Sequence, residues 1–139
     1  MIARELEVRY TGGPALPRGK AVLVPADVAM VAGPLLAGLT HEVFLAIYLD
    51  GRNRPIGYVR KDGTVASVAI RPADMFGTAY LCAAKSMILV HNHPSGDPSP
   101  SAEDRSLTAR MNEAGAMLGI EVLDHVILTD DGDWYSFAS

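Results

Sequence analysis

Two histidines and an aspartate within fourteen residues could bind one metal ion. His91 and His93 flank Asn92, and Asp104 follows a loop rich in proline and glycine. Two imidazoles and one carboxylate are a common ligand set for catalytic zinc, because they leave a fourth tetrahedral position for water. A positive ion there lowers the pKa of the bound water towards neutrality. The pattern predicts a hydrolytic metal site if the three side chains meet.

The segment from Ser101 to Asp104 has a second explanation that needs no metal. Ser-x-x-Asp has the form of a capping box, in which the serine caps a helix and the acid bonds back to a backbone N–H. Capping leaves the paired histidines and the rigid loop 94–100 unexplained. Spacing alone leaves both interpretations of Ser101 and Asp104 open.

A hydrolytic site also needs a general base that is not a metal ligand. Glu42 is the leading candidate, since it stands at the start of the apolar run 43–49, where a strand end could approach the histidines. A solvated charge at the start of a strand explains the same residue without any catalytic role. Periodicity by itself favours that simpler explanation.

Hydrophobic periodicity predicts the elements that must position these side chains. We expect helices over 25–39, 72–84 and 101–119, and strands over 6–10, 43–49, 55–59, 65–70, 86–90, 121–128 and 134–137. Pro34 should kink or split the first helix. Extended backbone after residue 90 would turn His91 and His93 to one face, and the next helix would bring Asp104 back towards them. Hairpins and helix crossovers together indicate a mixed α/β domain.

Length and composition indicate one globular domain over residues 1–139, with residues 1–20 as a short strand and a lead-in. Neither an apolar run of membrane-spanning length nor a signal peptide is evident, so no membrane partner is expected and the cytoplasm is the expected compartment. Cys82 is the single cysteine, which excludes an internal disulfide and a thiolate zinc site. We expect Cys82 to be buried in packing.

The net charge of −4 argues against a domain that binds nucleic acid by bulk electrostatics. A local basic cluster nevertheless occupies the expected hairpin, at Arg52, Arg54, Arg60 and Lys61. A solvated hairpin face is the simpler explanation of this cluster, and contact with a partner or with nucleic acid is the alternative.

The run His-Asn-His-Pro-Ser-Gly from His91, followed by Ser-x-x-Asp, resembles the metal motif of the JAMM (MPN+ or JAB) metalloprotease superfamily. More narrowly, it is similar to the RadC-like branch, and the similarity covers about residues 24–137. The resemblance implies a curved mixed β-sheet flanked by helices, the JAB/MPN architecture that is also cytidine deaminase-like. It implies that His91, His93 and Asp104 bind zinc. It also implies that Glu42 is the general base and that Ser101 is the oxyanion donor.

The activity implied is zinc-dependent hydrolysis of a peptide or isopeptide bond in a protein substrate, by a metal-activated water. Helix capping and oxyanion binding would compete for the one hydroxyl of Ser101. His125 matches a family position, and we expect it to make a hydrogen bond in or near the core and not to bind metal. Two departures from the family are expected: an absent N-terminal helix-hairpin-helix region, and a changed Pro-Arg-Glu segment at 71–75.

Two other functions compete with hydrolysis. A zinc-binding but catalytically idle interaction module, acting in DNA processing or repair, is the alternative that the basic hairpin supports. A zinc nucleobase deaminase fits poorly, because the chain lacks the Pro-Cys-x-x-Cys ligands of that chemistry. Neither the substrate nor the oligomeric state can be read from the sequence.

Overall fold

The computed structural model describes residues 2–17, 19–63 and 70–138. Within them, one mixed sheet has the strand order β2-β1-β3-β4-β5. The strands are β1 (Val43–Leu49), β2 (Pro55–Asp62), β3 (Ser86–Asn92), β4 (Glu121–Leu128) and β5 (Trp134–Ser136), and the helices are α1 (Pro25–Leu36), α2 (Pro72–Leu81) and α3 (Ala102–Leu118). Strands β3 and β4 are parallel, and the other neighbours are antiparallel. This is the predicted α/β fold.

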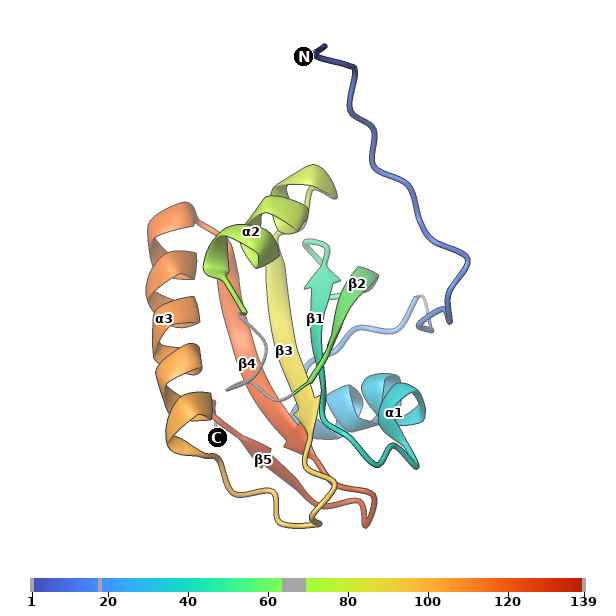
Figure 1. The fold of residues 1–139 in the computed structure, drawn as a ribbon, viewed down its shortest axis with the longest axis vertical. Helices are drawn as coiled ribbons and strands as arrows, with labels where there is room; N and C mark the ends of the chain where they lie inside the picture. Colours follow the sequence, from blue (N-terminus) through green and yellow to red (C-terminus); the bar gives the residue numbers. More distant parts are fainter. Residues whose placement is uncertain (1, 18, 64–69, 139) are drawn as a thin grey trace.

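The sheet separates two hydrophobic cores, with α1 on one face and α2 and α3 on the other (Figure 1). All seven residues of β1 are buried, which explains why its sequence is a continuous apolar run. Its alternate residues divide between the layers: Val43 and Leu45 pack with α1, whereas Phe44 packs with α2 and α3. The same alternation in β3 turns His91 towards α3, where its ring stacks on that of Phe44.

Helix α3 is the crossover between the parallel strands β3 and β4, and its termini match the sequence prediction. Ser101 caps the N-terminus through its side chain. Gly119 ends the helix with a left-handed φ of 75°, a conformation that suits glycine. Because the crossover begins at the end of β3, the first turn of α3 lies beside the last residues of that strand.

Two predictions for the N-terminal third were wrong. Residues 6–10 form no strand, and Leu6 is 91% exposed. The Tyr10 hydroxyl donates a hydrogen bond to the Ile56 carbonyl, but this is a side-chain contact with the sheet and not strand pairing through the backbone. Alternating apolar residues do not make a strand without a hydrogen-bonding partner. Of the kink or split expected at Pro34, the split does not occur, because Pro34 lies in the last turn and the helix ends two residues later.

The other boundaries differ by a few residues. Helix α1 ends before Leu39 and α2 ends before Ala84, whose neighbour Ala83 has a φ of 58° that helices exclude. Cys82 follows α2 and is half-buried, so it is less enclosed than predicted. The predicted strand 65–70 falls almost wholly outside the described residues. No helix in the described part of the chain is long and apolar enough to cross a membrane.

Candidate metal centre

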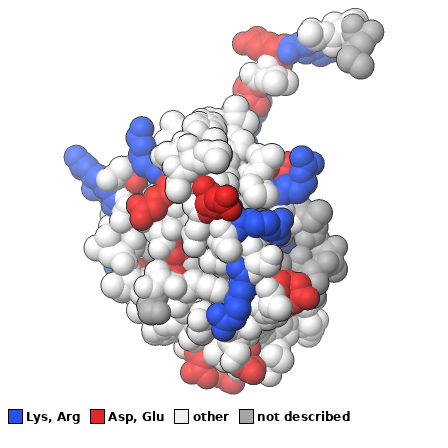
Figure 2. All heavy atoms as spheres, turned by 90° about the vertical axis from the view of Figure 1, so that its left-hand side faces the viewer, with Lys and Arg blue, Asp and Glu red and all other residues white. Residues whose placement is uncertain are grey.

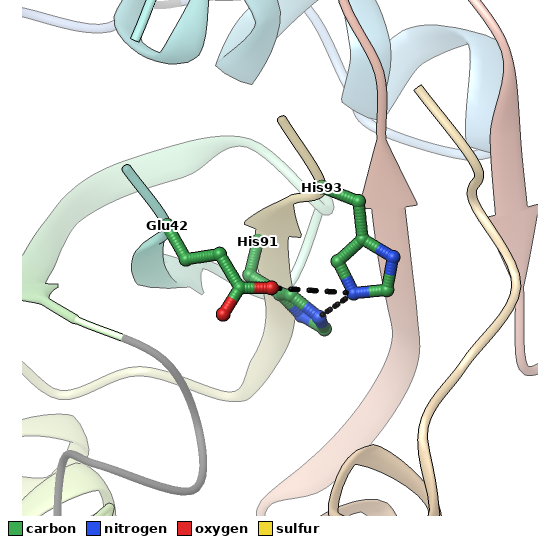
Figure 3. A group of neighbouring side chains, drawn as sticks. All are labelled: Glu42, His91 and His93. Atoms are coloured by element: carbon green, nitrogen blue, oxygen red, sulfur yellow. Dashed lines mark hydrogen bonds and ion pairs between the residues drawn. The ribbon is translucent and has the colours of Figure 1, made fainter. Parts of the chain in front are cut away.

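The end of β3, the start of β1 and the first turn of α3 bring four ionisable side chains together. The Nε2 atoms of His91 and His93 lie 3.1 Å apart. Asp104 Oδ1 lies 3.2 Å from His91 Nε2, and Asp104 Oδ2 lies 3.3 Å from His93 Nε2. Glu42 approaches from the other side, with Oε1 at 3.6 Å from His93 Nε2 (Figure 3). Glu42, His91 and His93 form a group that could hold a metal ion.

These spacings fit a small tetrahedral ion. Bonds of about 2.0–2.1 Å to zinc imply edges of about 3.3 Å between ligand atoms. The Nε2 atoms of the two imidazoles lie 3.1 Å apart, and they lie 3.2 and 3.3 Å from the two different oxygens of the Asp104 carboxylate. The donor set of two imidazoles and one carboxylate also suits the ion. The residues present therefore fit a zinc site.

His93 is oriented by the loop that follows it. Its Nδ1 lies 2.9 Å from the carbonyl oxygen of Asp97. A carbonyl only accepts, so Nδ1 must carry a proton, and in the neutral ring Nε2 then has a lone pair directed at the site. The backbone N–H of His93 also bonds to the Leu128 carbonyl at 2.9 Å, which ties the start of the loop to β4. The proline-rich segment 94–100 thus has a positioning role.

Asp104 takes part in both structures that the sequence left open. Its backbone N–H donates to Ser101 Oγ at 3.0 Å, and its Oδ2 accepts from the Ser101 N–H at 2.9 Å, which completes the capping box. Burial alone would raise the pKa of the Asp104 carboxyl, but the facing His91 and His93 rings and the Ser101 N–H hold that pKa far below its usual range. Asp104 is therefore a fixed anion facing the imidazoles.

Ser101 lies at the rim of the site, and its two expected roles are compatible. The cap uses a lone pair of the hydroxyl oxygen as acceptor. The hydroxyl proton is not consumed by that bond, so it can be donated elsewhere. The expected competition between capping and oxyanion binding was therefore wrong on this point.

Glu42 owes its position to Asn92, a residue that the sequence analysis passed over. Asn92 Oδ1 accepts from the Val43 N–H at 2.7 Å, and Asn92 Nδ2 donates to the His41 carbonyl at 3.0 Å. The amide thus holds the backbone on both sides of Glu42. Asn92 is buried on the face of β3 opposite His91, and its place between two histidines at a strand end was the only signal in the sequence.

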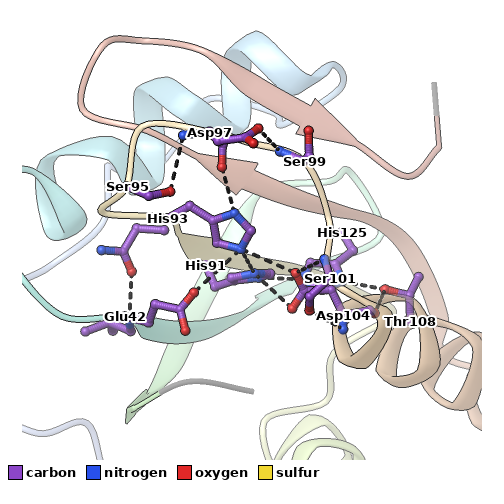
Figure 4. Close-up of polar contacts among 12 residues, drawn as sticks. Glu42, His91, His93, Ser95, Asp97, Ser99, Ser101, Asp104, Thr108 and His125 are labelled. Carbon is purple, nitrogen blue, oxygen red and sulfur yellow. Dashed lines mark hydrogen bonds and ion pairs between the residues drawn. The ribbon is translucent and has the colours of Figure 1, made fainter. Parts of the chain in front are cut away.

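His125 lies behind His91 and not in the group that could hold a metal. Its Nε2 is 2.8 Å from His91 Nδ1, and its Nδ1 is 2.6 Å from the hydroxyl of Thr108 (Figure 4). Burial lowers the pKa of His125 to about 3, and the nearby His91 adds to the shift. Thr108 follows Asp104 by one helical turn, but no feature of the sequence distinguished it.

Two acids in the hairpin, Asp50 and Asp62, offset part of its positive charge. The Arg60 guanidinium pairs with Asp62, with Nε to Oδ1 at 2.7 Å. Asp50 accepts backbone N–H bonds from Arg52 and Arg54.

Over α3, which Figure 2 views from outside, basic and acidic side chains are interspersed and do not form one basic area. This face lacks the single-sign charge that nucleic-acid binding favours.

Comparison with known proteins places the chain in a family. A family model described as the RadC-like JAB domain matches residues 22–139. The chain belongs to this family. UPF0758 proteins of Trichlorobacter lovleyi and Desulforamulus reducens are 46% and 43% identical over 97 and 120 residues, or 69% and 84% of this chain. The one from Salinibacter ruber is 45% identical over 77% of this chain.

The chain spans about half the length of these relatives, covering 42%, 53% and 46% of them respectively. The family match agrees with the resemblance inferred from the motif at residues 91–104, and with the mixed sheet and its flanking helices.

Proposed function

We propose that this domain is a zinc-dependent hydrolase of peptide or isopeptide bonds. The observation that carries the proposal is the convergence of His91 Nε2, His93 Nε2 and the Asp104 carboxylate to within 3.3 Å of one another, with the Glu42 carboxylate beside them. Membership of the RadC-like JAB domain family, part of the JAMM superfamily, supports the same chemistry.

The two carboxylates divide into ligand and base by their surroundings. Asp104 approaches both imidazoles more closely than Glu42 approaches His93, and its side chain is 3% exposed against 23% for Glu42. A buried anion held by several donors suits a ligand. A more exposed carboxylate can meet a substrate and exchange protons with it. We therefore assign Asp104, with His91 and His93, to the metal and Glu42 to proton transfer.

When bound, a zinc ion would lower the pKa of a water molecule and polarise a substrate carbonyl. Glu42 accepts a proton from the attacking water at its carboxylate and later donates it to the leaving amine. Ser101, whose hydroxyl proton is not used by the helix cap, donates to the oxygen that becomes negative. The partner in this reaction is a peptide or an isopeptide-linked protein.

The test is cleavage by the wild type and by Glu42→Gln of a broad peptide library and of isopeptide-linked substrates, with zinc content measured in both. The variant should lose roughly 10²–10⁴-fold in rate, the usual contribution of a general base, and keep its zinc. Glu103→Gln is the matched control, because Glu103 is an exposed acid on the first turn of α3. A zinc-loaded wild type that cleaves nothing, or a fully active Glu42→Gln, contradicts the proposal.

A zinc-binding module without catalysis, acting in DNA processing, is the second candidate function. It rests on the four basic residues of the β1–β2 hairpin, although Asp50 and Asp62 offset part of that charge. It predicts salt-sensitive DNA binding that weakens in Arg52→Ala/Arg54→Ala. It also predicts that Glu42→Gln leaves every function unchanged, which separates it from the hydrolase.

A further inference from the structure

Three buried side chains form a continuous hydrogen-bonded line behind the candidate metal centre. His91 Nδ1 lies 2.8 Å from His125 Nε2, and His125 Nδ1 lies 2.6 Å from Thr108 Oγ1. Thr108 Oγ1 in turn lies 2.8 Å from the Asp104 carbonyl oxygen. His91 and His125 are each 1% exposed and Thr108 is 6% exposed. The line, drawn in Figure 4, therefore runs through the core from α3 through β4 to β3.

The line has a direction that can be found by counting protons. The Asp104 carbonyl can only accept, so the Thr108 hydroxyl donates its single proton there. The hydroxyl oxygen must then accept from His125 Nδ1–H. The ring of His125 contacts a hydroxyl and an imidazole, and a neutral ring has one N–H. His125 Nε2 is therefore an acceptor, and His91 Nδ1 carries the proton.

We propose that Thr108 and His125 are positioning residues that hold His91 in the tautomer with the proton on Nδ1, so that Nε2 presents a lone pair to the metal. This inference rests on the proposed metal centre. The opposite direction would place a proton on His91 Nε2, the atom that faces Asp104 and His93. A proton at that position would exclude the ion, because a ligating imidazole nitrogen must be unprotonated.

The ring of His125 is held firmly enough to act in this way. It stacks on Phe137, with centroids 4.9 Å apart and 14° between the planes, and meets the edge of Phe44. The neighbouring Asp124 carboxylate accepts from the Ala138 N–H at 3.0 Å and from the Ser136 hydroxyl, which fastens the chain around Phe137. Packing therefore fixes the ring plane, and Thr108 fixes which nitrogen carries the proton.

The two candidate histidine ligands are thus oriented by different devices. A backbone carbonyl, that of Asp97, accepts from His93 Nδ1. His91 is oriented instead by two side chains: His125 Nε2 accepts from His91 Nδ1, and Thr108 orients His125. Partners that fix a ligating histidine contribute about 10–100-fold in metal affinity. Only the side-chain device can be removed by substitution without touching a ligand.

The experiment measures the zinc affinity of the wild type, Thr108→Val and Thr108→Ser by competition with a chelator. Valine keeps the shape of threonine and lacks the hydroxyl, whereas serine keeps the hydroxyl. We expect Thr108→Val to bind zinc about 10–100-fold more weakly and Thr108→Ser to stay close to the wild type. Heteronuclear NMR of the zinc-loaded wild type should show the His91 proton on Nδ1.

A purely structural role of Thr108 would lower the stability of the metal-free protein without this affinity loss, so unfolding of the apo-proteins is measured alongside. Equal zinc affinity of Thr108→Val and the wild type overturns the positioning role of Thr108 and His125 and leaves the metal centre intact, whereas a His91 proton found on Nε2 contradicts both, because a protonated Nε2 cannot bind the ion. A wild type that takes up no zinc overturns the proposed function, and with it the positioning role of Thr108 and His125 at that site. The two failures are therefore distinguishable.

Discussion

Asp104 and Glu42 are carboxylates that face the same pair of imidazoles, yet they are held in very different ways. Asp104 is buried, bonded to the Ser101 N–H and placed within 3.3 Å of both histidine rings. Glu42 is partly open to solvent and makes its closest imidazole contact at 3.6 Å. Chemical type alone does not distinguish the two carboxylates, and their difference in anchoring and burial is the basis for proposing Asp104 as the ligand and Glu42 as the proton carrier.

The same division extends to the surrounding elements. His91 and Asp104 form the inner half of the site, and they are held by the capping box and by the line through His125 and Thr108. His93 and Glu42 form the outer half. There the positions are set by contacts with backbone, through the Asp97 carbonyl and through the Asn92 amide. The inner half is preorganised in the core, and the outer half is placed where a substrate can reach it.

Neutralising each carboxylate in turn is the strongest test of the proposed difference between Asp104 and Glu42. We expect Asp104→Asn to weaken zinc binding by about 100-fold or more, beyond the effect of losing a residue that merely supports a ligand. Glu42→Gln should keep affinity within about tenfold of the wild type, since it removes a neighbour and not a ligand. Chelator competition measures both, with Glu103→Gln as control. Equal losses would mean that both carboxylates are ligands.

The inner half was also the part most accessible from sequence. His91, His93 and Asp104 are close in the chain, so a strand end, a rigid loop and a helix start sufficed to predict that they meet. Glu42 lies far upstream, and its approach depends on β1 lying next to β3, an order that periodicity does not contain. The family resemblance supplied it. Thr108 and Asn92 were missed because their roles depend on tertiary register.

Asn92→Ala should separate the outer half from the inner one. The substitution leaves the Val43 N–H and the His41 carbonyl without their buried side-chain partner, at a cost of about 1–3 kcal/mol in unfolding free energy. It also frees the backbone around Glu42, so cleavage per zinc-loaded molecule should fall while zinc affinity stays near that of the wild type.

Denaturant unfolding, cleavage rate and zinc competition test this expectation, with Asn112→Ala, an exposed asparagine of α3, as control. A fall in zinc affinity as large as the fall in rate would show that the two halves are not independent. An unchanged rate would show that Glu42 does not need the amide for its position.

The smallest effect on stability and zinc affinity is expected at Ser101, where the cap of α3 meets the candidate metal centre. Ser101→Ala removes the side-chain acceptor for the Asp104 N–H and should lower the unfolding free energy by about 1 kcal/mol. The Ser101 N–H still donates to Asp104 Oδ2, so the ligand keeps its anchor and zinc affinity should change little. Ser106→Ala, an exposed serine inside the same helix, controls for the change of residue type.

Rate then decides what the Ser101 hydroxyl does besides capping. If its proton stabilises the developing negative charge, Ser101→Ala should lose roughly 10²–10³-fold in cleavage, as removal of an oxyanion donor does elsewhere. That loss would far exceed what the small change in stability can explain. A variant destabilised as expected but cleaving at the wild-type rate would leave Ser101 as the helix cap alone. Catalysis would then rest on Glu42 and the three ligands.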